Sequence, residues 1–256
     1  MFHVPFMWAL IVGGICIILY TLMGGFLAVC WTDLIQGILM VIAIVVVPAL
    51  WWFTVGGWDG ISAVADANNI SMSLWPQNEH PIRSIISTAA WGLGYCGMPH
   101  ILARFMSVGK VKDLRPAMYI AVVWVIISLG FAVVVGFVGM AAVPGLEKPM
   151  HETVFIQMAR TAFHPLISGI FLAAILAAIM STIDSQLLVS ASVLTEDLNR
   201  KISGRKLSEK SRMTLGRIGV LVISVVAMVI AADRNSSILK LVEYAGGGLG
   251  AAFGPV

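Results

Sequence analysis

The chain has 256 residues, of which 59% are hydrophobic and only 11% charged, and its formal net charge is +3. Soluble domains carry about 25% charged residues, so this composition excludes a water-soluble globular fold. The small positive charge is not typical of a nucleic-acid-binding surface, because the basic residues sit in short loops between apolar stretches. Three cysteines, an odd number in apolar surroundings, argue against a disulfide scaffold.

Uncharged stretches long enough to cross a bilayer recur along the chain. Residues 4–32, 34–58 and 117–143 carry no charge, and residues 165–183 nearly fill a bilayer. Backbone polar groups in lipid must be paired within their own segment, and these stretches are too long for barrel strands. We therefore expect an all-α integral membrane bundle of about seven spans, at 6–29, 34–57, 82–106, 117–143, 163–195, 213–232 and 237–256.

Lysines and arginines gather in alternate loops and thereby predict the orientation. One side holds Lys110, Lys112, Arg115, Arg200, Lys201, Arg205, Lys206, Lys210 and Arg212. The other side holds only Arg83, Lys148, Arg160, Arg234 and Lys240. The first side is therefore predicted to be cytoplasmic, and the N-terminus to lie outside. The outer segments 58–81 and 144–162 are expected to be loops without a catalytic constellation, and no enzyme motif is found elsewhere.

Asp33 stands between the first two predicted spans, near their cytoplasmic ends. Its position just before an apolar run favours an N-cap for the second span. A carboxylate on the path of an ion is the alternative, and the two roles are compatible.

Four helix-breaking residues interrupt the third span, namely Gly92, Gly94, Gly97 and Pro99. Broken helices near the midplane are where secondary transporters bind substrate, because their backbone polar groups need a watery cavity or protein around them. Trp91 and Tyr95 stand four residues apart and so share one helix face, which suits an aromatic wall of a binding site. A kinked packing helix with an interfacial tryptophan explains the same pattern equally well.

The fifth span combines small residues with oxygen-bearing side chains. The small residues, which let another helix approach closely, are Ala173, Ala174, Ala177 and Ala178. Ser181 and Thr182 follow with adjacent hydroxyls, and a hard cation such as sodium requires several oxygen ligands. Hydroxyls of this kind often bond back to their own helix instead. Asp184 favours a function, because a carboxylate in a membrane helix costs about 2.5–3.5 kcal/mol.

Four blocks of sequence follow one another in a specific order. They are YTLMGGFLAVCWTD at 20–33, WGLGY at 91–95 with PHILARFM at 99–106, AILAAIMST at 174–182 with TEDL at 195–198, and AGGGLGAAFGPV at 245–256. Together they resemble the sodium:solute symporter family, and within it the bacterial sodium/proline symporters. The resemblance extends over nearly the whole chain and is weakest in the two outer segments.

The resemblance implies the leucine-transporter type of fold, which is built from two inverted five-helix repeats. It also implies that this chain is a single core fragment, residues 1–256, that lacks the opening spans and with them the first core helix. The chain stops at Val256 inside an apolar segment, which indicates a fragment on other grounds.

Site residues are implied in the same way. Sodium would sit between the first core helix and the fifth span, held by the Ala178 carbonyl and the Ser181 and Thr182 hydroxyls. The substrate site would comprise Trp91, Gly94, Tyr95, Gly97, Met98 and Pro99. Family members with a second sodium use a carboxylate matching Asp33 and a hydroxyl matching Ser185. Asp184 adds another carboxylate, and because two close carboxylates do not readily both stay charged, a proton could replace the second sodium.

The function implied is sodium-coupled import of proline or a similar small amino acid across the cytoplasmic membrane, with the lipid bilayer as the surrounding partner. Proline symporters usually have glutamine where this chain has Met98, and methionine donates no hydrogen bond. Two alternatives therefore stay open. One is a symporter for another organic solute, such as a vitamin or carboxylate, and the other is the membrane input domain of a sensor protein.

Overall fold

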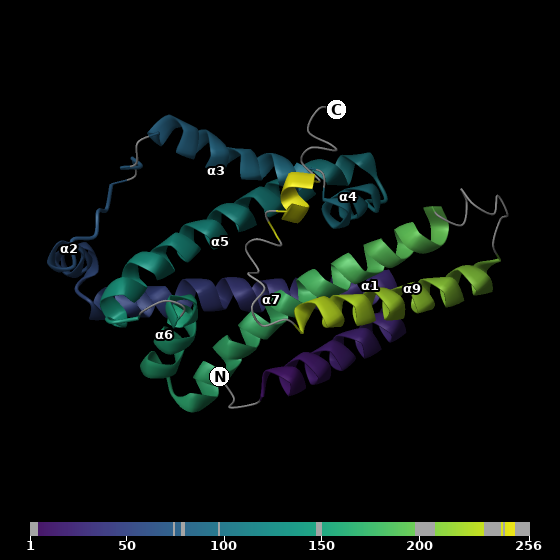
Figure 1. Ribbon diagram of the computed structural model, residues 1–256, viewed down its shortest axis with the longest axis horizontal. Coiled ribbons are helices and arrows are strands. Elements are labelled where there is room, and N and C mark those ends of the chain that lie inside the picture. Colours follow the sequence, from purple (N-terminus) through teal and green to yellow (C-terminus); the bar gives the residue numbers. More distant parts are fainter. Residues whose placement is uncertain are drawn as a thin grey trace. The chain divides into compact units, whose positions relative to one another are not determined.

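The computed structural model describes residues 5–73, 75–77, 80–96, 98–146, 150–197, 208–232, 242 and 244–248, and the regular elements in these ranges are all helical (Figure 1). The chain forms two compact units. The first unit comprises Met1–Thr32, Asn78–Val108 and Met180–Val256, and the second comprises Asp33–Gln77 and Gly109–Ile179.

Helix α1 (Phe6–Thr54) breaks at Gly25, whose φ of 61° and ψ of −169° are non-helical. Only glycine adopts such angles without strain, so the helix divides into two arms, 6–24 and 26–54. Two spans, 6–29 and 34–57, were predicted over this stretch, with the break between them next to Asp33. In the structure the break lies at Gly25 instead.

The prediction that Asp33 caps the second span is therefore wrong, because Asp33 lies inside the second arm. Thr32 beside it is also helical, and its hydroxyl donates to the carbonyls of Ala28 at 3.2 Å and Val29 at 2.9 Å. The Thr32 hydroxyl is thus satisfied within the helix, so it does not require the helix to end there.

The third predicted span consists of two helices, α3 (Pro81–Cys96) and α4 (Pro99–Met106). Met98 precedes α4 in an extended conformation, with φ −73° and ψ 116°, and Pro99 is the first helical residue. The predicted interruption is thus confirmed, but it is confined to the end of the glycine-rich run. Helix α3 passes through Gly92 without a break.

The outer segment 58–81 was expected to be a loop, but most of its first half belongs to α2 (Gly57–Ala67). Gly56 and Gly57, with φ of 84° and 63°, turn the chain out of α1. One face of α2 buries Ile61 and Ala65 completely, and this burial is what so short a helix needs to be stable.

The second outer segment, 144–162, is likewise largely helical. It contains η2 (Met150–Thr153) and α6 (Val154–Ala162). Met158 and Ala159 of α6 are completely buried. The loop prediction failed for both outer segments because charged and polar residues on one face masked a narrow apolar face on the other.

The remaining spans match the predictions closely. Helix α5 (Leu114–Ala142) follows a short η1 (Val111–Asp113), α7 (Pro165–Ser192) continues into the π-helix η3 (Val193–Asp197), and α9 is Glu209–Ala231. Four helical stretches among the described residues are long and apolar enough to span a membrane. The seventh predicted span, 237–256, lies mostly outside the described residues.

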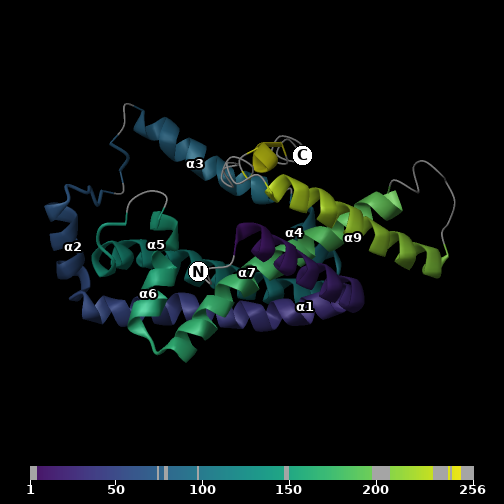
Figure 2. The same cartoon turned by 60° about the horizontal axis from the view of Figure 1, so that its bottom comes forward.

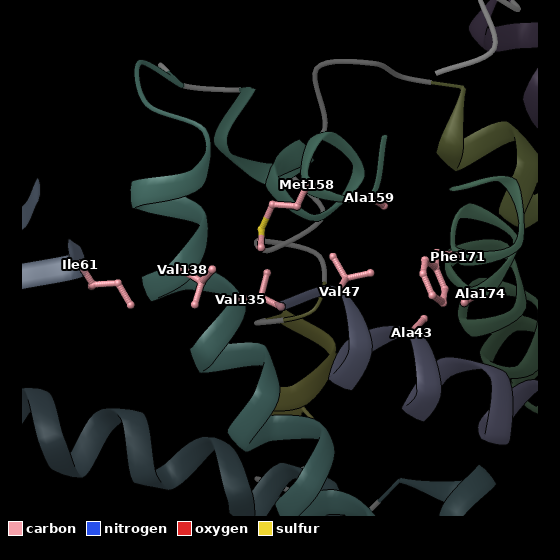
Figure 3. Packing of buried hydrophobic residues seen from close by; sticks show 9 residues of the cluster. All are labelled: Ala43, Val47, Ile61, Val135, Val138, Met158, Ala159, Phe171 and Ala174. Atoms are coloured by element: carbon pink, nitrogen blue, oxygen red, sulfur yellow. The ribbon is translucent and has the colours of Figure 1, made fainter. Parts of the chain in front are cut away.

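The core of the second unit is an apolar cluster contributed by five helices (Figure 3). Its buried residues are Ala43, Val47, Ile61, Val135, Val138, Met158, Ala159, Phe171 and Ala174. Two hydrogen bonds fix α6 against this cluster. Trp51 Nε1 donates to the carbonyl of Met158 at 3.0 Å, and Ser168 Oγ donates to the carbonyl of Ala159 at 2.7 Å.

Gly139 lets α5 and α6 approach, and we expect Gly139→Ala to lower the free energy of unfolding by about 1–3 kcal/mol. A Cβ at this position would lie 2.3 Å from Val154 Cγ2, and the branched valine cannot easily move away. Gly136→Ala is the matched control, since nothing lies within 4 Å of its Cβ position on the same helix. Thermal unfolding in detergent measures both, and equal stability of the two variants would contradict the packing described.

In the first unit, α9 packs against η3, which continues α7 (Figures 1 and 2). A Cβ on Gly219 would lie 3.3 Å from both Ala191 Cβ and Thr195 Cγ2. Small residues thus allow the two backbones to come close, as is usual for helices in membranes.

Candidate functional site

The predicted sodium ligands lie on one face of α7. Ala178, Ser181 and Thr182 are spaced three and four residues apart, which places them above one another on the helix surface. Ala178 and Ser181 are half-buried, whereas Thr182 is exposed. This face therefore presents one carbonyl and two hydroxyls on a part of α7 that the chain itself does not fully cover.

A cavity of about 440 Å³ lies beside Ala178 within the second unit. Its walls come from the second arm of α1, from α5, from the η2–α6 segment and from α7, and Ala178 is part of the α7 wall. The lining is mainly apolar, although Ser128 and Glu152 contribute polar groups. The predicted ligand Ala178 thus borders a cavity between helices.

Asp184 and Ser185 follow on α7 and form the centre of a buried polar cluster in the first unit. Asp184 is completely buried and Ser185 is 6% exposed. The Tyr20 hydroxyl donates to Asp184 Oδ2 and lies 3.3 Å from the carbonyl of Met180. Tyr20 comes from the first arm of α1, so the cluster joins this arm to α7.

Arg104 connects α4 to the same cluster, because its Nη2 donates to Ser185 Oγ. The Ser185 hydroxyl in turn lies 2.8 Å from the carbonyl of Ser181 and 3.3 Å from Asp184 Oδ1. The cluster therefore reaches the backbone of the predicted sodium ligand Ser181.

Neither Tyr20 nor Arg104 was predicted as an ion or substrate ligand. They are 164 and 81 residues away along the chain from Asp184 and Ser185, respectively, and no periodic spacing links such distant positions. The available signal was indirect, since both residues stand inside the sequence blocks on which the family resemblance depends.

Asp33 is half-buried in the second arm of α1 and belongs to the second unit, whereas Asp184 and Ser185 belong to the first. Its predicted role beside these two residues, in a second ion site or proton path, stays a prediction.

The predicted substrate residues surround the break between α3 and α4. Trp91, Gly94 and Tyr95 lie in the last turns of α3, and Met98 and Pro99 begin α4. Gly97 lies outside the described residues. The carbonyl of Met98 accepts from the amides of Ile101 at 3.0 Å and Leu102 at 3.2 Å, so it is used in starting α4.

Histidine, cysteine and acidic side chains do not gather into a metal-binding group of three or more anywhere in the described ranges.

The family model described as the sodium:solute symporter family matches residues 1–256. The high-affinity proline transporter PutP of Bacillus subtilis (strain 168) is 45% identical over 94% of this chain and 51% of its own length. The osmoregulated proline transporter OpuE of the same organism is 47% identical over 93% of this chain and 49% of its own length. Sodium/proline symporter 2 of Staphylococcus saprophyticus is 44% identical over 100% of this chain and 50% of its own length.

A solved structure of a sodium-coupled sialic acid symporter, in a substrate-bound outward-open state, is similar with a TM-score of 0.78 and 21% identity. The match covers 99% of this chain and 56% of that chain. At this identity the likeness concerns the fold, and it confirms the predicted all-α membrane bundle. This chain spans about half the length of the curated relatives it matches.

Proposed function

Because the chain belongs to the sodium:solute symporter family, we propose that this protein imports proline together with sodium across the cytoplasmic membrane. The substrate is inferred from the relatives, which are named as proline transporters at 44–47% identity. An identity of this size over nearly the whole of this chain supports a shared ion chemistry and a shared class of substrate.

The observation that carries the proposal is the oxygen-bearing face of α7. Ala178, Ser181 and Thr182 supply three oxygens within one helical turn, and a carbonyl oxygen keeps a second lone pair when it accepts a helical hydrogen bond. Thr182 is exposed in this chain, which leaves room for a covering element. We propose that a helix outside this chain completes the ion site, so sodium binding and uptake require the full-length protein.

Coupling of proline import to sodium requires that each ligand binds one conformation of the transporter more tightly than another. A ligand shifts a conformational equilibrium only as far as it binds one state more tightly than the other. Sodium on the α7 face would favour an outward-open state that admits proline next to the α3–α4 break. Proline would then favour closure, because its contacts with both halves of the broken helix form only when the site is closed.

We expect Trp91→Ala to weaken proline binding by about tenfold or more while leaving sodium affinity nearly unchanged. Losing a large aromatic contact costs over about 1.4 kcal/mol, which corresponds to a factor of ten. Equilibrium binding of radiolabelled proline and of sodium to the purified protein measures the two separately. Trp75→Ala is the control, because Trp75 is 57% exposed in the outer segment. Equal loss of proline and sodium binding would contradict a role for Trp91 in the substrate site.

Uptake into proteoliposomes tests the proposal as a whole. We expect radiolabelled proline to accumulate under an inward sodium gradient and not under a matched potassium gradient. A competition panel of proline, other small amino acids, a vitamin and a carboxylate tests the substrate. Accumulation without sodium would refute the coupling, and inhibition by a solute of another class but not by unlabelled proline would refute the assigned substrate.

A further inference from the structure

We infer that Arg104 acts as a tethered cation that competes with sodium at the Asp184–Ser185 end of the ion-binding region and so promotes sodium release. This inference rests on the proposed function and adds a regulatory residue to the same site. Its basis is the contact between two helices of the first unit, in which Arg104 Nη2 of α4 donates to Ser185 Oγ of α7.

The geometry at Ser185 leaves little room for two cations. A hydroxyl has one proton to donate and two lone pairs to accept with. The carbonyl of Ser181, at 2.8 Å, is the nearer acceptor for that proton, since Asp184 Oδ1 is at 3.3 Å. Arg104 uses one of the lone pairs. A sodium ion that approached the Ser185 oxygen would therefore face a guanidinium bound to the same atom.

The charge balance points the same way. Asp184 brings one negative charge into the cluster and is completely buried, while Arg104 brings one positive charge next to it. The Tyr20 hydroxyl, which donates to Asp184, is neutral. A sodium ion added to this arrangement would leave a net positive charge in a poorly solvated place, which is unfavourable. Departure of Arg104 would restore neutrality.

Arg104 is able to leave. Its side chain is largely exposed, so moving it away requires no opening of a packed core. A small cavity of about 10 Å³ lies at the contact and is bordered by His100, Arg104 and Ser185. This volume is close to the least that holds one water molecule. The Ser185 oxygen therefore lies beside a space suited to a single small species.

The test measures sodium affinity of the full-length protein in the absence of proline, by isothermal titration calorimetry. We expect R104Q to bind sodium about tenfold more tightly than the wild type, which corresponds to about 1.4 kcal/mol. R104K keeps the positive charge and should stay within about threefold of the wild type. R217Q is the matched control, because Arg217 is an exposed arginine of α9.

Unchanged or weaker sodium binding by folded R104Q, or an equal gain in R217Q, would overturn the inference. If R104Q does not fold, hydrogen–deuterium exchange of the wild type decides, since sodium should speed exchange of the α4 amides of residues 100–106. Equal or slower exchange there with sodium would overturn the inference as well. A wild-type protein that binds no sodium would instead refute the proposed function, and this inference with it.

Discussion

Replacing Ser181 or Thr182 with alanine in the full-length protein should raise the sodium concentration for half-maximal proline uptake by about ten- to a hundredfold. Each variant removes one oxygen ligand from a cation. Contacts between a polar group and a charge contribute about 1.5–3 kcal/mol, and about 1.4 kcal/mol corresponds to a factor of ten. The maximal uptake rate at saturating sodium should change less, because the ion still binds when it is abundant.

Ser190→Ala is the control for this prediction. Ser190 is an exposed serine of the same helix, and it lies outside the proposed ion-binding face. Its replacement should leave the sodium dependence of uptake unchanged. If Ser181→Ala and Thr182→Ala both behave like Ser190→Ala, the ion is not bound at this face of α7.

Asp184→Asn should weaken sodium binding by at least about tenfold. Asp184 lies three residues after Ser181 on α7, about 6 Å away for neighbouring helical positions. At this distance, and at an effective dielectric constant of about 20, a carboxylate attracts a cation by about 3 kcal/mol. Asparagine keeps the shape of the side chain and an oxygen that accepts from Tyr20, so the change removes the charge with little change in packing.

Asp113→Asn is the matched control, because Asp113 is exposed before α5. Both variants lose one negative charge, but only Asp184 lies next to the proposed ligands. Calorimetric sodium titration of the two purified variants distinguishes a local effect from a change in net charge. Sodium affinity equal to that of the wild type in Asp184→Asn would show that this carboxylate does not belong to the ion site.

The membrane-spanning helices could be predicted because the lipid environment imposes the same requirements on each of them. A segment in lipid must be long, apolar and internally hydrogen-bonded, and all three properties are visible in a single stretch of sequence. The predicted 117–143 and 163–195 accordingly match α5 and the α7–η3 stretch within a few residues. Pro99 likewise marked the start of α4 correctly, because proline fits the first turn of a helix.

The predictions that failed concern segments where the local sequence fits two different structures almost equally well. Asp33 looked like a helix boundary, yet the break is at Gly25, eight residues earlier, where glycine allows a positive φ. A polar residue between two apolar runs can either end a helix or be tolerated inside it, and the local sequence does not decide which. Helices α2 and α6 were missed for a related reason, since each is stabilised by burial against distant helices rather than by its own composition.

The candidate site was predictable where its residues follow one another along α7, from Ala178 to Ser185. Residues three or four positions apart on one helix lie on the same face, so their proximity can be read from the sequence. The contacts of Tyr20 with Asp184 and of Arg104 with Ser185 depend on tertiary packing instead. Packing of this kind between segments distant along the chain has no periodic signature, which is why the sequence pointed to the carboxylate but not to its partners.

A structure of the full-length protein determined with sodium and proline, at a resolution that shows bound ions, tests the central claim most directly. The account predicts an ion in contact with the carbonyl oxygen of Ala178 and the hydroxyl oxygens of Ser181 and Thr182, opposite a helix that is not part of this chain. Finding those two hydroxyls facing lipid, with the ion bound elsewhere, would contradict it.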